Sequence, residues 1–229
     1  MKIGRTLFWF RDGSERIQHL SGQFFGLGTL LNSLLNEKYN GKKIPFINLE
    51  FNTEKTYELF PVIPKNTPYY SGGDLQYYGW FDKDEFMKLS WSGQSVFLWE
   101  RGCQYLKESA QLMKNKDLTE AVDYAYHKGL AMELNPDFRA VDTEIILSGQ
   151  KIRASVWIVF KEEGMYSKLT LEQDGTVIFE KNIDQTAHGI EFFLEIYKSI
   201  SLEGENMVIK GHKDVEYLPL KIPLAELRI

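Results

Sequence analysis

The stretch LTLEQDGTVIF, residues 169–179, decides the fold class of the C-terminal part of this chain. Apolar and polar residues alternate on both sides of an Asp-Gly pair, which is typical of a β-hairpin. A three-residue loop, 173–175, places Leu171 opposite Val177, whereas a two-residue Asp-Gly loop would set Leu169 opposite a charged residue. Burial therefore favours the longer loop, with its glycine in the left-handed conformation.

The same two-residue periodicity begins near Ala140 and continues to the end of the chain. Residues 155–160 (SVWIVF) are apolar enough for a central strand. Turns are expected at 148–150 and 162–164, and strands at 207–209 and 215–222. Apolar residues at a spacing of three and four predict one amphipathic helix, 190–200. Residues 140–229 are thus expected to be mainly antiparallel β-structure with one helix.

Residues 1–139 read instead as helix-rich. After a short strand at 6–10, one helical stripe predicts a helix over 15–39, with Ile17, Leu20, Phe24, Leu27, Leu31 and Leu34 on one face. Residues 43–51 alternate as a strand does, and Pro45 confines the start of that strand to a sheet edge. Further helices are expected at 82–89, 94–113 and 118–134, with capping-box spacing at Asp82/Glu85 and Asp117/Glu120. Residues 94–101 could also form a strand, but a helical stripe through Trp99 and Cys103 favours the helix.

These elements predict a single α+β domain over residues 1–229, not an alternating βαβ chain. Its helix-rich N-terminal part, 1–139, would pack with a mainly antiparallel β-sheet in the C-terminal part, 140–229.

The charge of the chain is −5 and is unevenly placed. Residues 1–139 carry 17 Lys/Arg and 17 Asp/Glu, whereas residues 140–229 carry 10 and 15. An acidic chain is a poor nucleic-acid binder, because that affinity comes mainly from basic groups on phosphates. A basic protein partner would meet a favourable field at the C-terminal part.

The start of the chain, MKIGRTLFWFRDG, has too short an apolar run for a signal-peptide core, and no run of eighteen apolar residues predicts a membrane span. The single cysteine, Cys103, excludes an intrachain disulfide. We therefore expect a cytoplasmic protein without membrane association. The oligomeric state is left open.

No stretch of the sequence carries a recognisable catalytic, metal or cofactor motif. Gly22, Gly26 and Gly28 lie within a helical stripe and lack the Lys-Ser/Thr pair of a phosphate loop, so close packing explains them. The four histidines have no metal-ligand spacing, and Cys103 falls on an apolar stripe. Asp142 and Glu144 share one face of an expected strand, where charged pairs are common. No catalytic residue, metal or cofactor is predicted.

Residues 61–81 (PVIPKNTPYYSGGDLQYYGWF) combine six aromatic rings with prolines and glycines. Three prolines and a Ser-Gly-Gly run indicate a loop, whose rings either plug the core edge or form a contact surface. Tyrosine and tryptophan are the usual anchors of protein interfaces. The proposed partner-binding residues are therefore Tyr69, Tyr70, Tyr77, Tyr78 and Trp80, with Glu162, Glu163, Asp174 and Glu180 as acidic contacts.

An acidic α+β chain with a short cytosolic start, no catalytic motif and a tryptophan-bearing segment, SWSGQSVFLWERG with Trp91 and Trp99, resembles the bacterial immunity proteins that neutralise polymorphic toxins. That resemblance implies a non-enzymatic protein that occludes the active site of a basic toxin domain. Two alternatives stay open: a soluble hydrolase that binds a sugar or another small polar ligand among the rings, and an oligomeric scaffold that associates through them.

Overall fold

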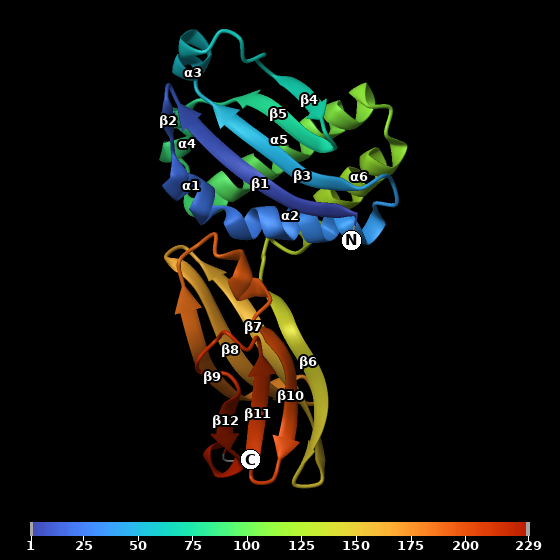
Figure 1. The fold of residues 1–229 in the computed structure, drawn as a ribbon, viewed down its shortest axis with the longest axis vertical. Coiled ribbons are helices and arrows are strands. Elements are labelled where there is room, and N and C mark those ends of the chain that lie inside the picture. Colours follow the sequence, from blue (N-terminus) through green and yellow to red (C-terminus); the bar gives the residue numbers. More distant parts are fainter. Residues whose placement is uncertain (1, 228–229) are drawn as a thin grey trace. The chain divides into compact units, whose positions relative to one another are not determined.

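The computed structural model of the chain describes residues 2–227 (Figure 1). The chain forms two compact units, one ending at Pro136 and the other beginning at Asp137. Both units contain a β-sheet, and all six α-helices of the described chain lie in the first. The α+β class is confirmed, but the N-terminal part is more than a helix-rich layer because it has a sheet of its own.

The N-terminal unit is built on a five-stranded sheet in the order β2-β1-β3-β5-β4. Strands β1, β3 and β5 are parallel to one another, and the edge strands β2 and β4 are antiparallel to their neighbours. The strands are β1 (Ile3–Asp12), β2 (Glu15–Arg16), β3 (Ile44–Asn52), β4 (Thr67–Ser71) and β5 (Asp74–Trp80). The helices are α1 (Gln18–Gln23), α2 (Phe25–Lys38), α3 (Glu54–Leu59), α4 (Lys83–Lys88), α5 (Trp91–Leu112) and α6 (Lys116–Ala131).

The expectation that the chain has no βαβ unit is wrong for this part of the molecule. Helices α1 and α2 connect β1 to the parallel strand β3, which is a βαβ crossover. β3 is an interior strand, although its pairing with β5 begins only at Ile47. Pro45 therefore lies in the part of β3 that pairs with β1 but not yet with β5. Proline fits there because it has no N–H to donate to a second neighbouring strand.

The helical stripe predicted over residues 15–39 is buried throughout, but it runs along two helices. The helix is interrupted at Phe24, between α1 and α2. Gly28 lies against β1, where an added Cβ would come within 2.7 Å of the Thr6 carbonyl oxygen. Close packing thus accounts for this glycine.

Two predicted helix starts have different outcomes. Asp82 caps α4, since its side chain accepts a hydrogen bond from the Glu85 amide at 3.1 Å. The prediction for Asp117 is wrong, because α6 starts at Lys116 and its cap is Asn115, whose side chain accepts from the Leu118 amide. Asn is as good a cap as Asp, so the spacing alone could not select between them.

The segment expected to be an aromatic loop is mostly a β-hairpin. β4 and β5 pair antiparallel around a turn at Gly72 and Gly73, which have φ angles of 62° and 98°. Two glycines that tolerate positive φ make this tight turn feasible. Pro68 lies on the edge strand β4. Proline is tolerated on an edge strand because only one side of such a strand pairs with a neighbour.

The C-terminal unit consists of two antiparallel sheets, of four strands in the order β6-β7-β8-β9 and of three in the order β10-β11-β12. Figure 1 shows the smaller sheet lying across the larger one. The strands are β6 (Phe138–Leu147), β7 (Gln150–Lys161), β8 (Gly164–Gln173), β9 (Thr176–Thr186), β10 (Tyr197–Glu203), β11 (Asn206–Gly211) and β12 (Leu220–Pro223), with short 3-10 turns η1 (Glu191–Leu194) and η2 (Leu224–Leu227). The central strand, the turns near 149 and 163, and the strand at 207–209 are confirmed.

The predicted register of the β8–β9 hairpin is wrong. The loop has two residues, Asp174 and Gly175, both at positive φ, and a bulge follows, so that Leu171 lies opposite Phe179. Burial does not choose the register here, because β9 is an edge strand that is largely exposed.

The helix predicted at 190–200 is also absent. Residues 191–194 form only the turn η1, and the strand β10 starts at Tyr197. Tyr197 and Ile200 are both buried because the register of β10 shifts between Tyr197 and Ser199. A bulge of this kind gives a strand the three-residue apolar spacing of a helix.

Candidate functional site

Helices cover one face of the five-stranded sheet, whereas the other face is covered only near the carboxyl ends of its strands, where Tyr57 and Phe60 lie next to Gly79 and Arg11. Helices α4, α5 and α6 lie behind the sheet in Figure 1 and pack on alternate residues such as Phe8, Leu49 and Tyr77. We call the other side the open face. Its register pairs bring together Trp9, Arg11, Asn48, Glu50, Asn52, Gln76, Tyr78 and Trp80.

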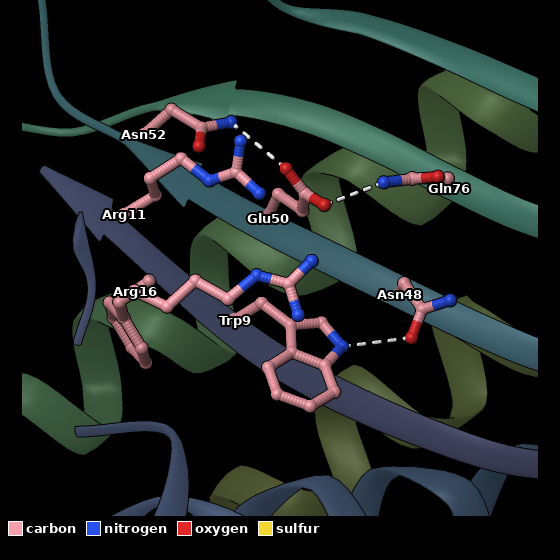
Figure 2. A pocket seen from close by; sticks show the side chains of 8 residues that line it. Trp9, Arg11, Arg16, Asn48, Glu50, Asn52 and Gln76 are labelled. Atoms are coloured by element: carbon pink, nitrogen blue, oxygen red, sulfur yellow. Dashed lines mark hydrogen bonds between the residues drawn. The ribbon is translucent and has the colours of Figure 1, made fainter. Parts of the chain in front are cut away.

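A pocket of about 220 Å³ lies on the open face (Figure 2). β1, β2, β3 and β5 supply its lining, which consists of Trp9, Phe10, Arg11, Arg16, Asn48, Glu50, Asn52 and Gln76. Arg11, Glu50 and Asn52 lie on the carboxyl-terminal halves of the parallel strands β1 and β3, the end at which open α/β sheets usually bind ligands.

Hydrogen bonds between side chains hold the floor of the pocket. The Trp9 indole N–H donates to Asn48 Oδ1 at 2.9 Å. Gln76 Nε2 donates to one oxygen of Glu50 at 2.6 Å, and Asn52 Nδ2 donates to the other at 3.4 Å. Glu50 is thus held in place by two neutral amides.

The two arginines of the pocket have no such partners. The Arg16 guanidinium lies over the Trp9 ring, 6.0 Å from its centroid, and the Arg11 guanidinium lies 5.8 Å from the Phe60 centroid. Within residues 2–227, neither guanidinium forms a hydrogen bond or has a carboxylate at ion-pair distance. Both positive charges are therefore available to a bound group.

Asn52 adds an unsatisfied acceptor to the same pocket. The residue is fully buried, and its Oδ1 has no hydrogen-bond partner in the part of the chain that the structure describes. A buried acceptor without a donor costs about 1–3 kcal/mol.

The structure separates the five aromatic residues predicted to anchor a partner. Tyr69 and Trp80 lie on the open face and are 55% and 38% exposed, and Tyr78 lies between them and is half-buried. Tyr70 is exposed but pairs with Leu75, which puts it on the opposite side of the sheet.

The Tyr77 side chain is buried and is not available to a partner. It is 1% exposed, stacks on Tyr105 with 4.1 Å between ring centroids, and its hydroxyl donates to Glu108. Burial, together with the Glu108 carboxylate, raises the pKa of the Tyr77 phenol. This residue must therefore be counted with the core.

The four predicted acidic contacts are not brought together. Glu162 and Glu163 form the β7–β8 turn and Asp174 lies in the β8–β9 turn, at opposite ends of the ten-residue strand β8. Such a strand is roughly 30 Å long. Glu180 faces the middle of β8 and pairs with Lys168 at 2.9 Å. These residues form no common surface with one another.

Other candidate reactive groups also have structural explanations. Cys103 is buried, and that burial raises the pKa of its thiol to about 12. Asp142 forms an ion pair with Arg153, which lowers the pKa of the carboxyl to about 2. Across residues 2–227 no group of three His, Cys, Asp or Glu side chains could hold a metal ion.

None of the helices within residues 2–227 is long and apolar enough to span a membrane.

The residues of the pocket were not predicted from the sequence. Their one signal was the alternation in residues 43–51, where polar Asn48 and Glu50 follow apolar Ile47 and Leu49. An interior parallel strand covered on both faces would be apolar throughout. An interior parallel strand that alternates thus marks a sheet with one open face.

A scan against protein-family models finds no match for the chain, and searches of curated proteins and of solved structures find none either. The geometry of the open face therefore carries the functional argument.

Proposed function

We propose that this chain is a non-enzymatic binding protein that holds a protein partner against the open face of its N-terminal sheet. The observation that carries the proposal is the pair of guanidiniums, Arg11 and Arg16, that have no carboxylate partner within the described chain and lie on a face with exposed rings. Arginine, tryptophan and tyrosine dominate the energetics of protein interfaces. The open face carries all three.

The specific form that we propose is an immunity protein, which protects a cell by covering the active site of a toxin. The sequence resemblance described above supports this form. The open face favours a partner region that brings acidic groups, because its unpaired charges are positive. This differs from the basic partner suggested by the overall charge.

A hydrolytic function has less support. Glu50 is the only carboxylate among the residues that line the pocket, whereas glycoside hydrolysis uses two carboxylates about 5–10 Å apart. The other pair considered, Asp142 and Glu144, lies on β6 in ion pairs with Arg153 and Lys151. An arginine-paired carboxyl with a lowered pKa is a poor general acid.

Affinity purification of the tagged full-length chain from its native host, followed by mass spectrometry, tests the proposal. Wild type is compared with the double variant Tyr69→Ala/Trp80→Ala. Phe192→Ala is the control, because Phe192 is 49% exposed and lies in the C-terminal unit. We expect wild type and the control to retain one stoichiometric partner.

The double variant should bind that partner at least about 30-fold more weakly, the effect of a hot spot of 2 kcal/mol. Co-expression should then show that the retained partner is toxic without this chain. A partner that binds the double variant normally would contradict the assignment of the open face. Failure to retain any partner would contradict the binding function.

A further inference from the structure

The pocket on the open face has an excess of positive charge that its own residues do not neutralise. Two guanidiniums, Arg11 and Arg16, face one carboxylate, Glu50, and Glu50 is already bonded to the amides of Gln76 and Asn52. Figure 2 shows the guanidinium of Arg16 above the Trp9 ring. A ligand with a single negative charge would balance this lining, because the lining has a net charge of +1.

The partner proposed above can supply such a charge. Proteins carry single negative charges on the carboxylates of Asp and Glu side chains. An acidic residue of the partner is therefore the fitting group.

The size of the pocket also indicates a single residue. Pockets for drug-sized ligands measure roughly 300–1,000 Å³, and this one measures about 220 Å³. Carboxylate suits the two arginines because the planar guanidinium fork can bind both of its oxygens. A phosphate dianion fits less well, since it would bring a second negative charge next to Glu50.

We propose that this pocket receives one acidic residue, Asp or Glu, of the protein partner, with its carboxylate between Arg11 and Arg16. This inference rests on the proposed function, because it names the group by which the partner is held. Arg16 is the first residue to test, since it is exposed and its replacement does not disturb the core.

The test uses two small probes of nearly the same shape, one charged and one neutral: glutamate with an N-acetyl and a C-methylamide cap, and glutamine with the same caps. Each is titrated into the ¹⁵N-labelled full chain while the Trp9 indole N–H signal is followed by NMR. Trp9→Phe identifies that signal among the five tryptophans. The signal reports on the pocket because the Trp9 indole bonds to Asn48 on the pocket wall.

We expect capped glutamate to shift the Trp9 signal saturably and capped glutamine to leave it unchanged. Arg16→Ala should weaken the binding of capped glutamate at least about tenfold, since it removes the guanidinium fork, and Arg16→Lys should fall between, because it keeps only the charge. Arg153→Ala, which removes one positive charge from the C-terminal unit, should bind as wild type does.

Equal shifts with both probes, or none with either, would overturn the inference. A shift with inorganic phosphate but not with capped glutamate would also overturn it and identify a phosphate site instead. The purification experiment stays independent, because Tyr69 and Trp80 do not line the pocket. The double variant could lose the partner while neither probe shifts the Trp9 signal. That result would refute the binding of an acidic residue in the pocket but would still support the binding function.

Discussion

The two units of the molecule contain the same pair of side chains on a sheet surface, with one difference. In the C-terminal unit, Arg139 lies 4.5 Å from the centroid of Trp157, whose indole donates to Thr170. In the N-terminal unit, Arg16 lies 6.0 Å from the centroid of Trp9, whose indole donates to Asn48. Each tryptophan thus has an arginine over its ring and a neutral acceptor for its N–H.

The carboxylate makes the difference between them. Arg139 binds both oxygens of Glu172, at 2.8 and 2.9 Å, whereas Arg16 has no carboxylate partner in residues 2–227. An arginine that is already paired mainly serves the fold. An arginine that is not paired remains able to bind a carboxylate from another molecule. The comparison thus separates a structural sheet surface from a binding surface.

The largest expected effect is on the C-terminal pair. Arg139→Ala should lower the free energy of unfolding of this unit by about 2 kcal/mol, less than the 3–5 kcal/mol of a fully buried pair, since Glu172 loses its partner while only 12% exposed. Hydrogen exchange of the β7 and β8 amides measures this locally. Unchanged protection would show that this pair, too, is dispensable for the fold.

A second variant would make the N-terminal surface resemble the C-terminal one. Asn48→Asp keeps the acceptor for the Trp9 indole and adds a carboxylate beside the two arginines. It should weaken the binding of capped glutamate about tenfold, or about 1.4 kcal/mol, without lowering stability. Asn48→Gln, which stays neutral, serves as the comparison. Undiminished binding by the Asp variant would mean that the free guanidiniums do not hold the probe.

A smaller effect is expected at Asp142, whose pKa of about 2 in the folded state lies below its ordinary value of 3.8 because Arg153 binds it. A lowered pKa contributes stability above pH 3.8 that is lost as the pH falls towards 2. The carboxyl is 37% exposed, so solvent screening limits this contribution to below about 1 kcal/mol.

Asp142→Asn removes the contribution at every pH. The difference in urea midpoint between wild type and this variant should therefore shrink as the pH falls from 5 to 2. A difference that does not depend on pH would exclude the ion pair as its cause.

The smallest expected effect is on the stability of the N-terminal unit. Arg16→Ala should change its free energy of unfolding by less than about 0.5 kcal/mol, because the side chain is exposed and has no ion-pair partner among the described residues. Protection of the β1 and β3 amides from hydrogen exchange measures this. A loss as large as that of Arg139→Ala would show that both arginines are structural.

Local patterns of apolar residues were readable from the sequence. The stripe from Ile17 to Leu34 is buried, and the alternation in 43–51 is a strand. The hairpin β4–β5 was not recognised, because prolines and glycines are common both in loops and around tight turns. The spacing of Tyr197 and Ile200 indicated a helix. In the structure this spacing arises because a bulge adds one residue between them in the strand.

The residues of the pocket could not be grouped from the sequence. Arg11, Glu50 and Gln76 belong to three strands, which the parallel register places side by side across a βαβ crossover. No periodicity connects residues that are so far apart along the chain. The predicted anchors Tyr69 and Tyr77 belong to the same short segment of the sequence, yet one lies on the open face and the other in the core.

The α+β class, the buried stripes, the buried cysteine and the mainly antiparallel C-terminal part could be predicted from the amino-acid sequence, because each depends on local periodicity. Which sheet face stays open and which arginines have a carboxylate became visible only in the folded chain. Those properties depend on strand order and register, which join residues that are distant along the chain. The candidate site is a product of that pairing.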